Sequence, residues 1–129
     1  MRMTKSTMPT ATELAILQVL WTYGPLTVRE VHDHLSNDES MGYTSVLKML
    51  QVMHKKALVK RDESQRSHVY RSARPAEQTQ RGLVRNLVDK AFAGSATDLV
   101  VRALATKKLT PEEIETMRAL IDEKAREND

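Results

Sequence analysis

The segment that begins at residue 44 carries the side chains best placed to do chemistry. Its apolar residues recur at the i, i+3, i+4, i+7 and i+11 spacing of an α-helix packed on a core: Val46, Met49, Leu50, Met53 and Ala57. A second stripe, offset by roughly 160° around the helix, consists of hydrogen-bond donors: Thr44, Lys48, Gln51 and Lys55. One face is therefore anchored and the other offers donors and positive charge, which predicts a helix that reads DNA. The same pattern also fits the solvated face of an ordinary amphipathic helix.

Positive charge is concentrated around this segment. Residues 44–74 contain eight lysines and arginines against two acidic residues, whereas the whole chain carries a net charge of +3. Residues 1–75 hold 11 basic and 7 acidic residues, and residues 76–129 hold 9 and 10. A basic stretch beside a neutral remainder is the electrostatic footprint of phosphate binding, although a charged run also serves solubility. The distribution therefore supports a nucleic-acid partner.

The composition argues against catalysis and metal binding. The chain contains no cysteine, which excludes disulfides, thiolate nucleophiles and cysteine-built zinc sites. His32 and His34 lie two residues apart on a predicted helix and point about 200° away from each other, so they cannot easily share a metal ion. The other two histidines have no ligand spacing, and the four glycines are isolated rather than gathered in a phosphate-binding loop. We therefore expect no enzyme activity, no metal and no cofactor.

The overall composition is that of a soluble globular protein. Of 129 residues, 40% are hydrophobic and 29% are charged, and the length suffices for one compact domain or two small ones. No apolar run approaches the roughly 18 residues of a membrane span, and the N-terminus lacks the apolar core of a secretory signal. These features predict a cytoplasmic protein that does not associate with membranes.

Two capping boxes predict where the helices before the donor-bearing segment begin. Thr10 with Glu13 opens a first helix, which stops at a glycine-proline breaker. Thr27 with Glu30 opens a second helix, which ends in the polar residues 36–40. The donor-bearing segment is then the third helix of the chain.

Beyond this third helix, residues 58–62 and 68–72 each predict a short strand, and a polar stretch joins the two strands in a hairpin. Leu26 is placed for another very short strand. The order of helix, short strand, helix, helix and hairpin is that of a winged helix-turn-helix, whose second motif helix enters the major groove. Alternatively, the hairpin is only a structural cap over the helices. We predict a mostly α-helical chain with a small β-hairpin, a flexible N-terminus at residues 1–9 and a DNA-binding domain at residues 10–74.

Residues 75–126 predict a separate helical domain, followed by a tail at residues 127–129. A long helix begins after Pro75, a glycine-serine pair interrupts it, and Thr110-Pro111 is a clear start for the last helix. Three helices over about 50 residues carry more apolar surface than they can cover for one another, and a unit below roughly 70 residues usually needs staples or a partner. We therefore predict a homodimer, the alternative being that this segment folds back onto the N-terminal helices. The predicted interface consists of Leu83, Leu87, Phe92, Leu99, Val100, Leu104, Ile114, Met117 and Ile121.

A homodimer also fits the symmetry of an inverted-repeat DNA site. A symmetric pair of recognition helices reads an inverted repeat whose half-sites lie about one helical turn, or a multiple of it, apart. The alternative is a winged helix that serves as a protein–protein interaction adaptor without specific DNA binding. Salt distinguishes the two, because only a protein that neutralises phosphates releases counterions on binding DNA.

Five stretches of the sequence carry a family resemblance. They are residues 13–21 (ELAILQVLW), 26–31 (LTVREV), 43–50 (YTSVLKML), 86–92 (NLVDKAF) and 109–114 (LTPEEI). Together they resemble the BlaI/MecI/CopY family of transcriptional regulators, the penicillinase-repressor-like proteins, over nearly the whole chain. The resemblance implies a homodimeric winged-helix repressor bound to a palindromic operator in double-stranded DNA, with the C-terminal helices forming the dimer interface.

The resemblance also implies which side chains at the front of the recognition helix read bases. By position they are Thr44, Ser45, Leu47 and Lys48. The two hydroxyls and the ammonium group suit base edges or phosphates, whereas Leu47 can only contact a thymine methyl group. Other residues are expected to hold the DNA backbone or, at the hairpin tip, a phosphate or the minor groove: Gln51, Lys55, Lys56 and Arg71, and at the tip Arg66.

Two departures from the family pattern leave the inducing signal open. Antibiotic-responsive members are released from DNA by proteolysis at an Asn-Phe bond, but the aligned residues here are Arg102-Ala103, which puts induction by a sensor protease in doubt. Copper-responsive members carry a cysteine-rich metal site, and this chain has no cysteine. A possible partner is a sensor protease, and a gene for one beside the gene of this chain would support proteolytic induction. The sequence does not predict the operator or the regulated genes.

Overall fold

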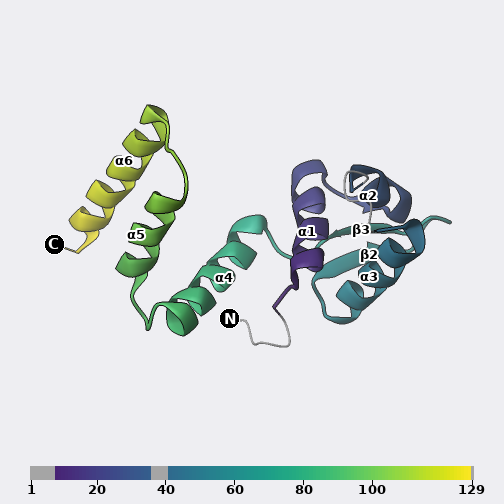
Figure 1. The fold of residues 1–129 in the computed structure, drawn as a ribbon. Coiled ribbons are helices and arrows are strands. Elements are labelled where there is room, and N and C mark those ends of the chain that lie inside the picture. Colours follow the sequence, from purple (N-terminus) through teal and green to yellow (C-terminus); the bar gives the residue numbers. More distant parts are fainter. Residues whose placement is uncertain (1–7, 36–40, 129) are drawn as a thin grey trace. The chain divides into compact units, whose positions relative to one another are not determined.

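A computed structural model describes residues 8–35 and 41–128 of the chain (Figure 1). The predictions for residues 1–7, for the polar stretch 36–40 and for residue 129 lie outside these residues. In the described part, helices and strands follow one another in the predicted order, and the mostly helical architecture with a small antiparallel sheet is confirmed. The elements are α1 (Ala11–Tyr23), β1 (Leu26–Thr27), α2 (Val28–His34), α3 (Tyr43–Lys55), β2 (Val59–Asp62), β3 (Val69–Ser72), α4 (Ala76–Ala91), α5 (Ala96–Thr106) and α6 (Pro111–Glu127).

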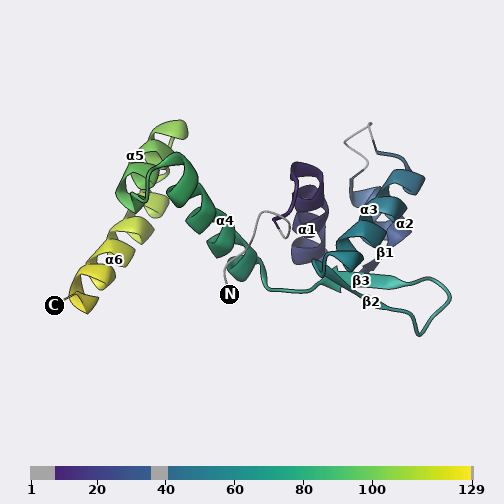
Figure 2. The same ribbon diagram turned by 90° about the horizontal axis from the view of Figure 1, so that it is seen from below.

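The three strands form one antiparallel sheet in the order β1-β3-β2. In the β2–β3 hairpin, Val59 pairs with Ser72 and Arg61 pairs with Tyr70, while β1 places Leu26 opposite Tyr70 on the other side of β3. The loop between β2 and β3 extends beyond the neighbouring helices and forms the wing (Figure 2). The predicted hairpin is therefore confirmed, and the very short strand at Leu26 joins it.

The core of the winged domain lies where α1, α2 and α3 pack with one side of this sheet. Burial of each aliphatic side chain there contributes roughly 1.5 to 3 kcal/mol to stability. Val46, Leu50 and Met53 are each 0% exposed, so the predicted apolar stripe anchors α3 and leaves its opposite side free. The buried apolar residues are Ile16, Leu17, Val19, Leu20, Leu26, Val28, Val31, Val46, Leu50, Met53, Leu58, Val59 and Tyr70.

The apolar stripe of α3 ends earlier than predicted. The helix ends at Lys55, and Ala57 is exposed with a φ of 63° in the turn that leads to β2. The Leu58 N–H donates to the Met53 carbonyl oxygen at 2.9 Å, which closes the helix end and directs Leu58 into the core. The prediction that Ala57 continues the buried stripe was wrong, because the chain leaves helical geometry before that residue.

Two long-range polar contacts tie α1 to the rest of the winged domain. Glu13 is buried in the predicted capping box, where its Oε1 accepts the Thr10 N–H at 2.8 Å, and its two oxygens accept hydrogen bonds from the Lys56 ammonium group at 3.0 and 2.9 Å. The Trp21 indole N–H donates to the Ser72 hydroxyl at 2.8 Å. The start of α1 is thus joined to the end of α3, and its second half to the end of β3.

The chain divides into two compact units, residues 1–86 and residues 87–129. The division falls inside α4, whose first turns belong to the first unit and include the buried Thr79. The winged-helix strands end at Ser72, before α4 begins. We propose that the DNA-binding domain ends at residue 74, as predicted from the sequence, although the first compact unit extends to residue 86.

The second unit contains the end of α4 together with α5 and α6. Within its described stretch, residues 87–128, no side chain is buried. Large apolar side chains stay exposed there, from 40% for Ile114 to 64% for Ile121. We infer that these side chains form an interaction surface. In the part of the chain that the structure describes, no helix is long and apolar enough to cross a membrane.

Candidate nucleic-acid interface

The helix α3 presents its donor stripe on the side away from the core. Thr44, Ser45, Lys48, Gln51 and Lys55 are all exposed. The anchored side of the same helix fixes their direction, because the buried stripe permits only one orientation of α3 about its own axis. The five side chains therefore form one polar and basic face.

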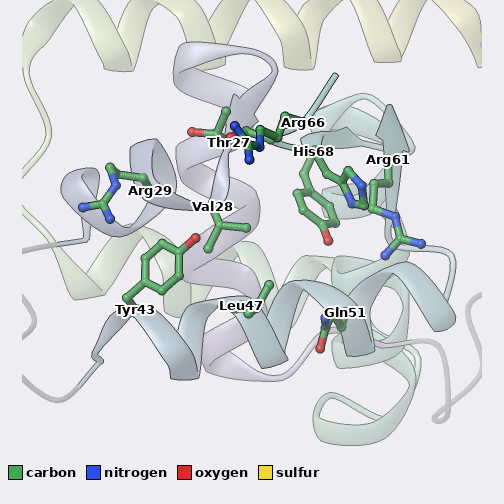
Figure 3. A pocket seen from close by; sticks show the side chains of 11 residues that line it. Thr27, Val28, Arg29, Tyr43, Leu47, Gln51, Arg61, Arg66 and His68 are labelled. Carbon is green, nitrogen blue, oxygen red and sulfur yellow. The ribbon is translucent and has the colours of Figure 1, made fainter. Parts of the chain in front are cut away.

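A groove of about 560 Å³ runs beside α3, between the start of α2 and the wing (Figure 3). Tyr43, Leu47 and Gln51, one helical turn apart, form its α3 side, and Leu47 is half-buried because it also packs against the core. Three of the lining side chains are arginines, and no carboxylate occurs among the described lining residues, so the groove is electropositive. The lining residues from the other elements are Thr27, Val28, Arg29, Arg61, Arg66, Ser67, His68 and Tyr70.

Arg29 marks the α2 side of this groove. It is the second residue of α2, and its guanidinium carbon lies 5.3 Å from the centroid of the Tyr43 ring. His32 contacts the same ring edge-on, with 6.3 Å between the ring centroids. The cation–π contact holds Arg29 beside the first turn of α3. Sequence reasoning missed Arg29 and Tyr43 as site residues. Both lie in stretches that carry the family resemblance, but neither belongs to the donor stripe, and their contact exists only once α2 packs across α3.

The wing supplies positive charge from the other side of the groove. Arg61 Nη2 lies 3.5 Å from Glu63 Oε2, and His68 Nε2 lies 4.0 Å from Glu63 Oε1. A side-chain hydrogen bond to Tyr70, together with the nearby Glu63 carboxylate, raises the pKa of Arg61 above its usual value. Arg66 is exposed in the loop between the strands. On this side of the groove, Arg61 of β2 is therefore held in place by its neighbours, whereas Arg66 of the wing is exposed.

Two further grooves border α3 and the wing. One, of about 500 Å³, is lined by Lys48, Gln51, Val52, His54, Lys55 and Arg61. The other, of about 690 Å³, is lined by His54, Ala57, Val59, Lys60, Arg61, Asp62, Arg71 and Ala73. The predicted residue Arg71 thus lies beside the hairpin groove rather than the one between α2 and the wing. Arg61 lines all three grooves, although it is in no predicted site.

The sequence profile described as penicillinase repressor matches residues 9–123. The chain belongs to the penicillinase repressor family. Two relatives from two strains of Mycobacterium tuberculosis, each described as transcriptional regulator BlaI, are 36% identical over 73 residues, which is 56% of this chain and 53% of the relative. The match thus spans about half the length of these relatives. The family resemblance is confirmed.

In this member of the penicillinase repressor family, Lys56 differs from the other predicted DNA contacts because it forms an ion pair inside the winged domain. Its ammonium group is bound by both oxygens of the buried Glu13. Lys55, one residue earlier, is exposed on the donor face. We therefore assign Lys56 to the stability of the domain and leave it out of the interface proposed below.

The residues predicted for the dimer interface lie on α4, α5 and α6, except Phe92, which lies in the turn directly after α4. Leu83, Phe92, Leu99 and Met117 are half-buried, and the other five are exposed: Leu87, Val100, Leu104, Ile114 and Ile121. Three further exposed apolar side chains of the same helices are not among the predicted interface residues: Val84, Val101 and Leu120. The pair Arg102-Ala103, which aligns with the cleavage site of antibiotic-responsive members, lies exposed within α5.

The side chains of His32, His34 and His68 lie near single carboxylates or aromatic rings. Across residues 8–35 and 41–128, no group of three or more histidine, aspartate or glutamate side chains is arranged to hold a metal ion. His34 stacks on Tyr23 with 3.8 Å between the ring centroids, and His32 contacts Tyr43. His32 and His34, which the sequence argues cannot easily share a metal ion, thus contact aromatic rings of neighbouring helices.

Proposed function

We propose that the chain is a sequence-specific DNA-binding repressor that acts as a homodimer on an inverted-repeat operator. The observation that carries the proposal is the exposed donor face of α3 beside an electropositive groove with arginines on both sides. An anchored helix with hydroxyl, amide and ammonium donors matches the way a recognition helix reads base edges in the major groove.

Within this proposal, Thr44, Ser45 and Lys48 read base edges from the front of α3. Leu47 contacts a thymine methyl group from its half-buried position, while Gln51 and Lys55 hold the DNA backbone. The arginines at the wing and at α2 lie beside the phosphates that flank the recognition helix. Arg66 at the wing tip and Arg71 on β3 complete the set that we assign to phosphate contacts.

The homodimer is supported by the apolar surface of the second unit. Residues 87–128 bury no side chain on their own, yet they expose leucine, isoleucine and valine on three helices. A second copy of the chain supplies the matching surface, because a twofold interface presents the same patch from both sides. Two half-site contacts then combine through the effective concentration that the linkage creates.

The test uses DNA fragments selected by the protein from random sequence. We expect binding that weakens steeply with salt, with a log–log slope of about −0.9 per phosphate neutralised. Lys48→Ala should lower affinity for the selected sequence by roughly 1 to 3 kcal/mol, and affinity for unrelated sequence much less, if Lys48 reads a base. Absence of DNA binding even in dilute buffer would refute the repressor and favour a protein-binding adaptor.

A further inference from the structure

Arg61 occupies a position in the sheet that favours an apolar side chain. Successive residues of a strand point to opposite sides, so Arg61 lies on the same side of β2 as the buried Val59. Its partner across the hairpin is Tyr70, which is 1% exposed and part of the core. The charged Arg61 side chain therefore lies at the edge of the hydrophobic core.

The guanidinium group is only partly satisfied there. Its side chain is 22% exposed, Glu63 approaches Nη2 at 3.5 Å, and Tyr70 lies opposite Arg61 on the neighbouring strand. The Nε atom is buried and, among the described residues, has no hydrogen-bond partner. A buried donor without a partner lowers stability, and groups of this kind concentrate at functional sites. The position is therefore better explained by a ligand than by packing.

The surroundings of Arg61 indicate the chemistry of that ligand. Arg61 lines all three grooves that border α3 and the wing, and Gln51 lines two of them. Lys48, Lys55 and Arg66 add positive charge along the same grooves, while Glu63 is the carboxylate that contacts the guanidinium. An arginine fork held on one edge keeps its remaining N–H groups for a phosphate, which accepts two parallel hydrogen bonds.

We propose that Arg61 binds a backbone phosphate of DNA at the junction of the recognition helix and the wing, held in position by Glu63 and Tyr70. This inference rests on the proposed DNA binding and adds a residue that sets the position of the wing on the duplex. Because its stem is packed and its fork is held, Arg61 loses less conformational freedom on binding than an exposed lysine does.

The test uses the full chain and a fluorescein-labelled 24-base-pair duplex of mixed sequence, followed by anisotropy over a series of NaCl concentrations. Arg61→Met keeps the length and packing of the stem and removes the charge. We expect its affinity at low salt to fall about tenfold, as for loss of one charge-assisted contact, and its salt slope to shrink by about 0.9 per protomer. The control is Lys108→Met, which removes the same charge from an exposed residue of the second unit and should leave the slope unchanged.

A thermal melt separates this contact from a structural role. The midpoint of Arg61→Met should stay close to that of the wild type, because the apolar stem is kept and the Glu63 carboxylate that loses its partner is exposed to solvent. Arg61→Lys is the second variant, since it keeps the charge but loses the planar fork: its slope should match the wild type while its affinity falls.

A folded Arg61→Met protein with wild-type affinity and slope would overturn the assignment, as would loss of folding in both variants. Failure of the wild type itself to bind the duplex would instead overturn the proposed repressor function.

Discussion

Replacing Lys56 should destabilise the winged domain without weakening its hold on DNA. The Lys56 ammonium group contacts both oxygens of Glu13 at 3.0 and 2.9 Å, and this carboxylate is only 1% exposed. Lys56→Met removes the cation but keeps most of the aliphatic stem. The variant therefore leaves a buried carboxylate whose described partner is the Thr10 N–H alone.

The magnitude follows from the burial of the two partners. Opposite charges about 4 Å apart attract by about 4 kcal/mol at an effective dielectric constant near 20, and removal of one partner from a fully buried pair costs about 3 to 5 kcal/mol. The Lys56 side chain is 30% exposed, so solvent screens part of the attraction. We expect Lys56→Met to lower the free energy of unfolding by about 2 to 3 kcal/mol.

Urea unfolding followed by tryptophan fluorescence measures this effect, because Trp21 is the single tryptophan and lies in the winged domain. The double variant Glu13→Gln with Lys56→Met should recover all but about 1 kcal/mol, since no charge is then left unpaired. On DNA, Lys55→Ala should reduce the salt slope by about 0.9, whereas Lys56→Met should leave it unchanged. Wild-type stability of Lys56→Met together with a reduced slope would refute the assignment and return Lys56 to the interface.

Two further predictions concern the oligomeric state of the chain and the dependence of its stability on pH. Leu87→Glu or Ile121→Glu should give monomers in sedimentation velocity, because each places a charge in the proposed apolar interface twice per dimer; a dimer that persists would move the interface elsewhere. The Thr27 and Thr110 capping hydrogen bonds lower the pKa values of Glu30 and Glu113 below their usual 4.5. Their stabilisation is present above that value and is lost as pH falls through the lowered folded pKa values. Thermal melts between pH 6 and 3 should therefore fall less steeply for Glu30→Gln with Glu113→Gln than for the wild type, and parallel curves would contradict this cause.

The elements that sequence could predict are those with local signals. The capping boxes at Thr10, Thr27 and Thr110 depend on residues three apart, and each starts a helix as predicted. The stripe of α3 was predicted from its period, but the period does not show where a helix ends. Ala57 adopts a left-handed backbone conformation, and a hydrogen bond from the Leu58 N–H closes the end of the helix. The spacing of apolar residues does not predict either feature.

The parts of the candidate site that sequence missed depend on contacts between distant residues. Lys56 was grouped with Lys55 because both are basic and adjacent, yet only the packing of α1 against the end of α3 brings Glu13 to it. Arg61 was counted as one charge in a basic stretch. Arg61 differs from the other basic residues because it lies opposite the buried Tyr70, on the same side of β2 as Val59. The two-residue spacing of Val59 and Arg61 in a predicted strand was the sequence feature that could have shown this.

The two units make different demands on the proposed repressor, and variants can separate them. The winged domain buries its own core, so Lys48→Ala alters the DNA-reading face without altering assembly. The second unit buries no side chain between residues 87 and 128, and in the proposed homodimer a second copy covers its apolar surface. A monomer keeps an intact α3 but loses the effective concentration that links two half-sites. Leu87→Glu should therefore bind an isolated half-site as the wild type does and lose affinity only on the inverted repeat. Equal losses on both DNAs would show that the second unit supports α3 directly.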